Sequence, residues 1–421
     1  MKRTVFLAHI FAVLLVGNSY AQKTTDRSVK DKVIIGKQLP AWKEGNLDIH
    51  AINTGRGEST LLIFPDGTTM LIDASGSLIS ATDSIPPPPQ KPNDAVSPGT
   101  AIANYAKHFI KPASNRLNYM MISHFHADHM GGYDDTLPMH SSNSFRLSGI
   151  TEVGAKIKVD QILDRGYPTY DYPKSLMSDT KMVNYIKFID WAKANYHLTA
   201  EKFAVGKNDQ IVLKQNPGKY ANFSVRNVLG NGEVWDGKGN GSVNMLPSKK
   251  ELIAGSYPEN ILSIGFVLAY GKFNYFTAGD LQFNDSDKHA WKDMEAPLAK
   301  VVSPVEVMKA NHHGTSQTNG DALLTKLKPQ VLLSHTWRDV QPNPATMARV
   351  YAANSDSQIF TTNMSDANKV RLGGLIDKMK NLSGHIVVRV QPGGDQYSVY
   401  VLDDNNEAYI VTKVFGPYKS N

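Results

Sequence analysis

Short apolar runs separated by turns dominate the chain from residue 47 onward. Apolar residues predominate in 47–52, 59–64 and 69–73, and the segments between them contain Gly, Pro and Asp. Runs of four to eight apolar residues bounded by such residues are typical of β-strands. The pattern therefore predicts three strands joined by tight turns.

The rest of the chain mixes longer periodic segments with further apolar runs. We expect helices over 101–110 and 181–194, and a buried strand over 119–123. Later strands are predicted over 210–213, 222–229, 261–268, 273–277, 305–309 and 331–334, with three more between 385 and 414. Residues 137–250 look less regular and contain a loop rich in Tyr and Pro. This order favours one α/β domain over residues 46–421 with an insertion or lid at 137–250, rather than two independent domains.

The amino terminus has the pattern of a secretory signal. A basic start is followed by a nearly unbroken apolar run over 5–16 and by the small-x-small sequence Ser19-Tyr20-Ala21. Such a segment is cleaved from the mature protein, and the apolar run is too short to span a bilayer comfortably. We therefore predict a signal peptide at 1–21, a polar lead-in at 22–45, and an exported protein that is periplasmic or secreted. No later segment is long and apolar enough to cross a membrane.

Composition narrows the chemistry further. The chain has no Cys, so it forms no disulfide, and any metal must be held by His and carboxylates. Without residues 1–21 the net charge falls from +6 to +4, with 43 basic and 39 acidic residues. This mild excess only weakly favours a polyanionic partner, and no basic stripe typical of nucleic-acid binding stands out. Nucleic acid thus remains one possible substrate, and the oligomeric state is left open.

Residue types that bind metals follow several apolar strands at their carboxyl ends. The positions are His124, His126, Asp128, His129, Asp280, His312, His313 and His335. In α/β sheets, functional sites form at the carboxyl ends of strands. Imidazole and carboxylate are the zinc ligands that remain when thiolate is absent, and one carboxylate can bridge two ions. Solvated loop histidines would not explain why these residues repeatedly follow strands.

The segment His124-Phe125-His126-Ala127-Asp128-His129-Met130-Gly131-Gly132 resembles the signature of the metallo-β-lactamase superfamily. Within this superfamily, the chain most resembles a branch that includes the extracytoplasmic domain of bacterial DNA-uptake channel proteins. Bacterial phosphorylcholine esterases look similar too. Three further motifs support the resemblance: Gly55-Arg56-Gly57-Glu58, Ala278-Gly279-Asp280 and His312-His313-Gly314-Thr315. Together with the signature, they extend the resemblance over roughly residues 46–415.

This resemblance implies an αββα sandwich that holds two Zn²⁺ ions, with Mn²⁺ or Fe as alternatives. It implies that His124 and His126 bind one metal, that Asp128 and His129 bind the other, and that Asp280 bridges them. His313 and His335 would complete the ligand sets.

His312 would face the substrate as a proton donor or oxyanion stabiliser, and Asp128 would share in catalysis; the order of His312 and His313 could be reversed. Many superfamily members carry a further metal-binding His between the first motif and the bridging Asp, and this chain has no evident counterpart. Only His140 and His197 lie in that interval, and neither follows a strand, so His313 could fill the vacancy.

Two residues near the motifs are candidates for substrate binding. Arg338 could clamp a phosphate, although a solvated loop role fits equally well. Thr315 could donate a hydrogen bond to substrate, although capping of a helix is the more common role.

The function predicted from these features is hydrolysis by a metal-bound hydroxide, with a small-molecule or nucleic-acid phosphodiester as the preferred substrate. Two alternatives remain. The same site supports hydrolysis of a lactone, β-lactam or thioester, because the ligands fix the activation of water and not the substrate. A non-catalytic, metal-dependent binding protein of the envelope is the other.

Overall fold

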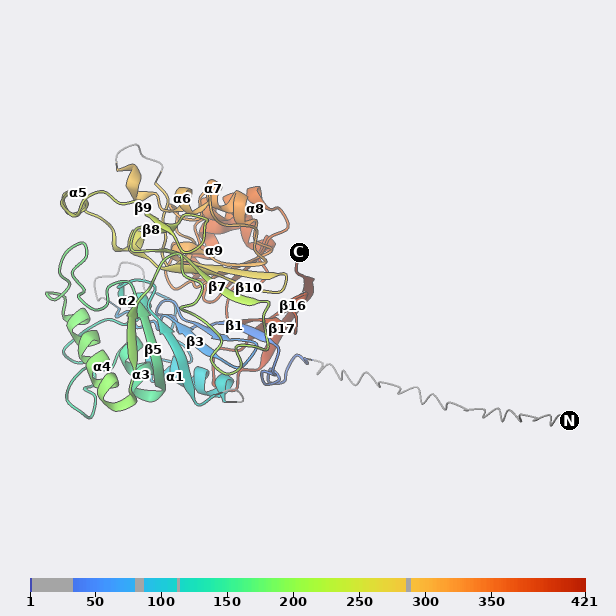
Figure 1. Ribbon diagram of the computed structural model, residues 1–421, viewed down its shortest axis with the longest axis horizontal. Coiled ribbons are helices and arrows are strands. Elements are labelled where there is room, and N and C mark those ends of the chain that lie inside the picture. Colours follow the sequence, from blue (N-terminus) through green and yellow to red (C-terminus); the bar gives the residue numbers. More distant parts are fainter. Residues whose placement is uncertain (2–32, 80–86, 112–113, 285–288) are drawn as a thin grey trace. The chain divides into compact units, whose positions relative to one another are not determined.

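The computed structural model describes residues 33–79, 87–111, 114–284 and 289–421, together with Met1 (Figure 1). Val33–Asn421 forms one compact unit. The predicted signal peptide, apart from Met1, and the first part of the lead-in lie outside the described residues. Among the helices that are described, none combines the length and hydropathy needed to cross a bilayer.

A nine-stranded sheet is built mainly from the first half of the chain. Its order is β17-β16-β15-β1-β2-β3-β4-β5-β6, antiparallel from β17 to β3 and parallel from β3 to β6. The strands are β1 Leu47–Ala51, β2 Thr60–Ile63, β3 Thr69–Ile72, β4 Arg116–Met121, β5 Lys158–Asp164, β6 Thr199–Lys202, β15 His385–Val390, β16 Gln396–Leu402 and β17 Val411–Lys419.

An eight-stranded sheet is built from the second half. Its order is β14-β13-β12-β11-β10-β7-β8-β9, with β11 to β14 parallel and the remaining pairs antiparallel. The strands are β7 Phe223–Gly230, β8 Glu233–Trp235, β9 Ser242–Asn244, β10 Gly265–Tyr270, β11 Phe273–Thr277, β12 Val307–Lys309, β13 Val331–Ser334 and β14 Gln358–Thr361.

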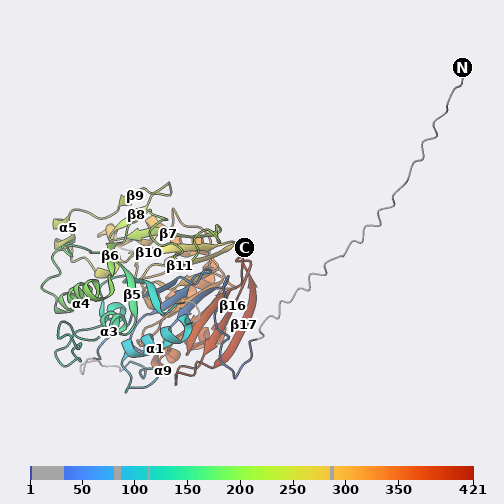
Figure 2. The same ribbon diagram turned by 60° about the horizontal axis from the view of Figure 1, so that its bottom comes forward.

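The two sheets face each other and helices cover both outer faces, which gives four layers (Figures 1 and 2). One apolar core lies between the sheets, and successive residues of β4 alternate between this core and the outer one, as Tyr119 and Met120 do. The outer core of the nine-stranded sheet is closed by α1 Pro98–Ile110, α3 Gly149–Lys156 and α4 Thr180–Tyr196. That of the eight-stranded sheet is closed by α5 Lys249–Ala254, α6 Glu295–Leu298, α7 Asp321–Leu327, α8 Pro344–Ala353 and α9 Asp366–Leu372. The expected αββα sandwich is therefore confirmed.

Most predicted strands are present, with two local differences. Residues 210–213 are not a strand, because the backbone of this segment bonds to side chains, as Val212 N does to the Tyr119 hydroxyl at 3.0 Å. The run predicted over 261–268 begins as a 3-10 turn, Glu259–Leu262, and becomes a strand only at Gly265. Residues 137–250, which the sequence presents as an insertion, supply β5 to β9 and thus belong to both sheets.

The parallel parts of the two sheets position the predicted site. β3 and β4 run parallel, so the residues that follow them, Asp73 and the segment beginning at Ser123, lie at one edge. β11, β12 and β13 also run parallel, and their carboxyl ends bring Asp280, the turn after Lys309, and His335 to another common edge. Ion pairs between Asp280 and His129 show that the two edges meet.

Candidate metal centre

Four predicted ligands lie in one turn at the carboxyl end of β4. His124 and His129 are fully buried, Asp128 is partly exposed and His126 is exposed. The short helix α2, Ala127–Met130, turns the chain so that residues two to five positions apart face the same space. His124 Nε2 lies 3.0 Å from His126 Nδ1, so these two rings present nitrogens to a common point.

Asp280, three residues past the last residue of β11, lies among the imidazoles. Its side chain is almost fully buried. Oδ1 lies 3.2 Å from His129 Nε2, whereas Oδ2 lies 3.8 Å from His124 Nε2. The same Oδ2 is 3.5 Å from His313 Nε2 and 3.6 Å from His312 Nε2. Both carboxylate oxygens are thus surrounded by nitrogens, as a bridging ligand requires.

His312 and His313, although adjacent in the chain, both bring Nε2 close to Asp280 Oδ2, from a backbone that turns sharply. Both have positive φ, +47° and +56°, within the turn Asn311–Gly314 that follows β12. Non-glycine residues held there are strained by about 1–3 kcal/mol each, and such strain concentrates at functional sites. His313 is buried, whereas the His312 side chain is 25% exposed, with amide nitrogens of Asn260 and Gln282 within 3.4 Å of its ring.

Two of the imidazoles form hydrogen bonds through Nδ1, so that Nε2 faces Asp280. His129 Nδ1 lies 2.8 Å from Asp73 Oδ2, and His313 Nδ1 lies 2.7 Å from the carbonyl oxygen of His335. In a neutral imidazole that donates from Nδ1, Nε2 carries no proton, and carboxylates and carbonyls that accept from Nδ1 favour this form in metal-binding His.

The buried donor atoms here have no hydrogen-bond partner. His129 Nε2 and Asp280 Oδ1 are both inaccessible to solvent and form no hydrogen bond, although they face each other. Leaving such atoms unsatisfied costs about 1–3 kcal/mol each. A cation between them would satisfy both, so the residues present fit a metal ion.

One group of atoms around this point could hold a first cation. Asp128 Oδ2 lies 3.2 Å from His313 Nε2 and 3.8 Å from His129 Nε2. Together with Asp280, these residues supply two imidazoles and two carboxylates, a donor set that suits zinc.

A second group of imidazoles lies around Asp280 Oδ2. His124 Nε2 is 3.8 Å and His312 Nε2 is 3.6 Å from this oxygen, and His126 Nδ1 lies 3.0 Å from His124 Nε2. Three imidazoles and a shared carboxylate could hold another cation. The geometry therefore brings His312 into a possible ligand set, in addition to its exposure to substrate.

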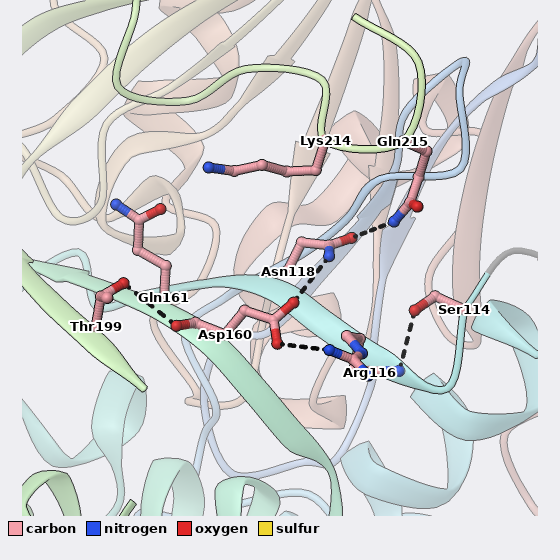
Figure 3. Close-up of a pocket in the computed structure, with 8 residues that line it drawn as sticks. All are labelled: Ser114, Arg116, Asn118, Asp160, Gln161, Thr199, Lys214 and Gln215. Carbon is pink, nitrogen blue, oxygen red and sulfur yellow. Dashed lines mark hydrogen bonds and ion pairs between the residues drawn. The ribbon is translucent and has the colours of Figure 1, made fainter. Parts of the chain in front are cut away.

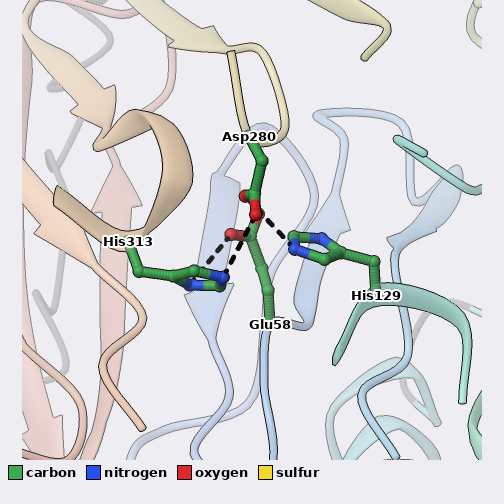
Figure 4. A group of neighbouring side chains, drawn as sticks. All are labelled: Glu58, His129, Asp280 and His313. Carbon is green, nitrogen blue, oxygen red and sulfur yellow. Dashed lines mark ion pairs between the residues drawn. The ribbon is translucent and has the colours of Figure 1, made fainter. Parts of the chain in front are cut away.

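Glu58 also reaches this centre, but it is paired with a lysine. Figure 4 draws the cluster in which potential donor atoms all lie within 4.8 Å of one another, Glu58, His129, Asp280 and His313. Glu58 Oε2 lies 3.0 Å from Lys309 Nζ, and both side chains are almost fully buried. Because this ammonium group already balances the carboxylate, Glu58 is better suited to supporting the site than to binding a metal.

Close backbone packing fixes Glu58 beside the motif. Glu58 N donates to the carbonyl oxygen of Asp128 at 2.8 Å. A Cβ on Gly57 would lie 2.1 Å from that same oxygen, so no side chain fits there.

The charges of the buried groups reinforce one another. Burial alone lowers the pKa of His313, but Asp280 and Asp128 overcome it and raise this pKa to about 9. Burial alone raises the pKa of Asp280, but His129 and His313 hold it well below its ordinary value. The carboxylates are thus ionised and favour positive charge next to them, which is the condition for cation binding.

Sequence comparisons find no matching family model and no matching curated protein. Two solved structures are similar to this chain. One is Igni18, a metallo hydrolase from the hyperthermophilic archaeon Ignicoccus hospitalis KIN4/I, with 11% identity, a TM-score of 0.35, and coverage of 75% of this chain and 94% of the other. The second is an isothiocyanate hydrolase from Delia radicum gut bacteria, with 14% identity, a TM-score of 0.34, and coverage of 80% and 95%.

His335, also predicted as a ligand, lies outside both groups of facing atoms. Its Nε2 is 3.1 Å from the carbonyl oxygen of Ser59, and its Nδ1 is 4.0 Å from Glu58 Oε2. Burial lowers its pKa to about 4, so the ring is neutral. Its observed contact with the centre is the backbone carbonyl that accepts from His313, and its ligand role stays a prediction.

The two predicted substrate-binding residues lie in neighbouring loops. Arg338 stacks on the ring of Trp337, 5.1 Å from its centroid, and its backbone N–H bonds to Gln341. Thr315 ends the turn of His312 through a backbone hydrogen bond of 3.0 Å. Their roles toward substrate also stay predictions.

Two clefts differ in their relation to the centre. A cleft of about 530 Å³ begins at the exposed ring of His126. Another, of about 520 Å³, lies at the amino end of β4, where Arg116 pairs with Asp160 at 3.2 Å (Figure 3). Because the histidine motif follows the carboxyl end of β4, only the first cleft adjoins the candidate centre.

Two supporting residues were not singled out from the sequence. Asp73 follows an apolar strand that runs parallel to β4, and this position was a usable signal. Lys309 was not detectable, because it lies inside an apolar strand and its partner Glu58 is 251 residues away.

Proposed function

We propose that this protein is a two-metal hydrolase of the metallo-β-lactamase superfamily, with zinc as the preferred ion. The observation that carries the proposal is the pair of buried, unsatisfied atoms, His129 Nε2 and Asp280 Oδ1, at the point where ligand-type side chains from both sheets converge. When bound, two divalent ions lower the pKa of water and polarise the scissile group.

The chain's own residues have separate tasks in this proposal. Asp280 bridges the two groups of ligands. Asp73 orients the His129 ring through Nδ1. His312, like His126, has solvent access, so it contacts substrate as well as Asp280.

Phosphodiesters are the substrate class that we propose. The motif resemblance and the mildly basic charge both support it. The signal-like amino terminus supports action outside the cytoplasm, in the periplasm or the medium.

Metal analysis tests the proposed two-metal centre, and a substrate panel tests the proposed substrate class. We expect about two transition-metal ions per chain, following the two-metal logic. The panel contains a bis-aryl phosphate, an aryl phosphorylcholine, single-stranded DNA, a lactone and a chromogenic β-lactam.

The outcomes separate the alternatives. Less than one ion per chain in metal-replete protein contradicts the dinuclear centre. Turnover of the lactone or β-lactam alone overturns the phosphodiester preference and leaves the hydrolase intact. Two bound ions without any turnover favour a metal-dependent binding protein.

A further inference from the structure

The cleft beside His126 has walls from three separate segments. The motif residues Phe125, His126 and Ala127 form one wall, residues 174–182 form a second, and residues 253–259 form the third. The last two belong to the loop and first turn of α4, and to the end of α5 with the start of the following 3-10 turn. A substrate whose reacting group contacts His126 therefore extends into this cleft.

Two of the charged pairs in the cleft are internally balanced. Lys181 Nζ donates to the carbonyl oxygen of Phe125 at 2.6 Å and lies 3.2 Å from Asp179 Oδ2. Both oxygens of Glu259 accept from the buried Arg165 at 2.6 Å. These four groups hold the walls together and leave no free charge for a ligand.

Lys174 is different. It lines the same cleft, its side chain is exposed, and within the described part of the chain it forms no hydrogen bond or ion pair. The uncompensated charge of the cleft is therefore positive, and it lies apart from the metal-binding atoms.

The cleft also has apolar surface. Ile253 is 49% exposed although it is a large aliphatic residue, and the partly buried Leu176 and Tyr257 lie along the same hollow. Exposed apolar surface within a cleft that adjoins a reactive centre is typical of a ligand-binding site.

We propose that this cleft binds the leaving arm of the substrate, and that the arm combines an apolar, aryl- or alkyl-sized group with a second negative charge. The apolar part contacts Ile253 and Tyr257, and the distal anion pairs with Lys174. Lys174 thus sets substrate specificity without touching the reacting atoms. This inference rests on the proposed function, because it assumes that the scissile group lies at the metal centre.

Direct binding tests the inference independently of turnover. The probes are two O-methyl benzylphosphonates, whose benzyl arm is held by a P–C bond that the enzyme cannot hydrolyse and carries a 4-carboxylate or a neutral 4-carboxamide. They are titrated calorimetrically into metal-loaded protein. We expect wild type to bind the carboxylate roughly fivefold more tightly, the range of an exposed ion pair. Lys174→Met should remove this preference and Lys174→Glu should reverse it.

Matched variants separate the effect of the Lys174 charge from that of apolar contact in the cleft. Lys107→Glu makes the same charge change on the exposed face of α1 and should keep the preference. Ile253→Ser should weaken both probes by the same factor. Absence of binding to wild type, or an unchanged preference in the Lys174 variants, overturns the inference. A Lys174-dependent preference in a protein that turns over no phosphodiester would contradict the proposed function alone.

Discussion

The carboxylate of Asp73 lies 2.8 Å from His129 Nδ1 and also accepts hydrogen bonds from Ser123 N and Oγ. Asp73 therefore fixes the orientation of the His129 ring and favours a proton on Nδ1, while Nε2 of the same ring faces Asp280. Loss of a carboxylate that hydrogen-bonds to a metal-binding imidazole typically lowers metal affinity about 10–100-fold. We predict this loss for Asp73→Ala, measured by competition with a chromogenic chelator. Unchanged affinity would show that His129 needs no such support.

Asp280→Ala should abolish hydrolysis and lower the metal content. The substitution removes the one carboxylate that faces imidazoles of both groups. Metal analysis and initial rates on the best panel substrate measure the two effects. Full activity in this variant would mean that the bridge is assigned to the wrong residue.

Glu58→Gln distinguishes a supporting carboxylate from a ligand. Since Lys309 Nζ lies 3.0 Å from Glu58 Oε2, the amide keeps the shape of the pair but leaves Lys309 without its counter-charge. We predict two bound ions, as in wild type, and a lower free energy of unfolding by about 3–5 kcal/mol. Loss of one ion without loss of stability would identify Glu58 as a ligand instead.

A buried pair far from the centre gives a pH prediction. Burial alone raises the pKa of Asp48, but Arg389, at 2.6 and 2.8 Å, lowers it from 3.8 to about 2. A lowered folded-state pKa stabilises the fold above pH 3.8, and this contribution, on the order of 2 kcal/mol, is lost as the pH falls toward 2. Urea unfolding of metal-free protein between pH 2 and 5 should show this slope.

Asp48→Asn provides the control for that slope. It should destabilise the protein by about 3–5 kcal/mol at neutral pH, because Arg389 loses its partner. It should also lack this part of the acid dependence. An identical slope in both proteins would assign the acid sensitivity to other carboxylates.

The sequence predicted the layers and most of the centre because both depend on local patterns. An apolar strand followed at once by His or Asp places that residue at the edge of a parallel sheet, and this holds for His124, Asp280 and His313. Contacts across the sheets were not accessible in this way. That the backbone carbonyl of His335 would contact His313, and its ring the carbonyl oxygen of Ser59, depends on how the residues beside β2 and β13 pack together. The role of residues 137–250 as strands of both sheets was hidden for the same reason.

Ligand-type residues of the candidate centre come from both sheets, with His129 on one and Asp280 on the other. A bound ion therefore acts as a cross-link between the two halves of the chain, and its binding energy is added to the stability of the fold. Free metal at a hundred times its dissociation constant contributes about 2.7 kcal/mol. If the proposed centre binds metal, metal supply in the protein's surroundings would govern its lifetime as well as its activity.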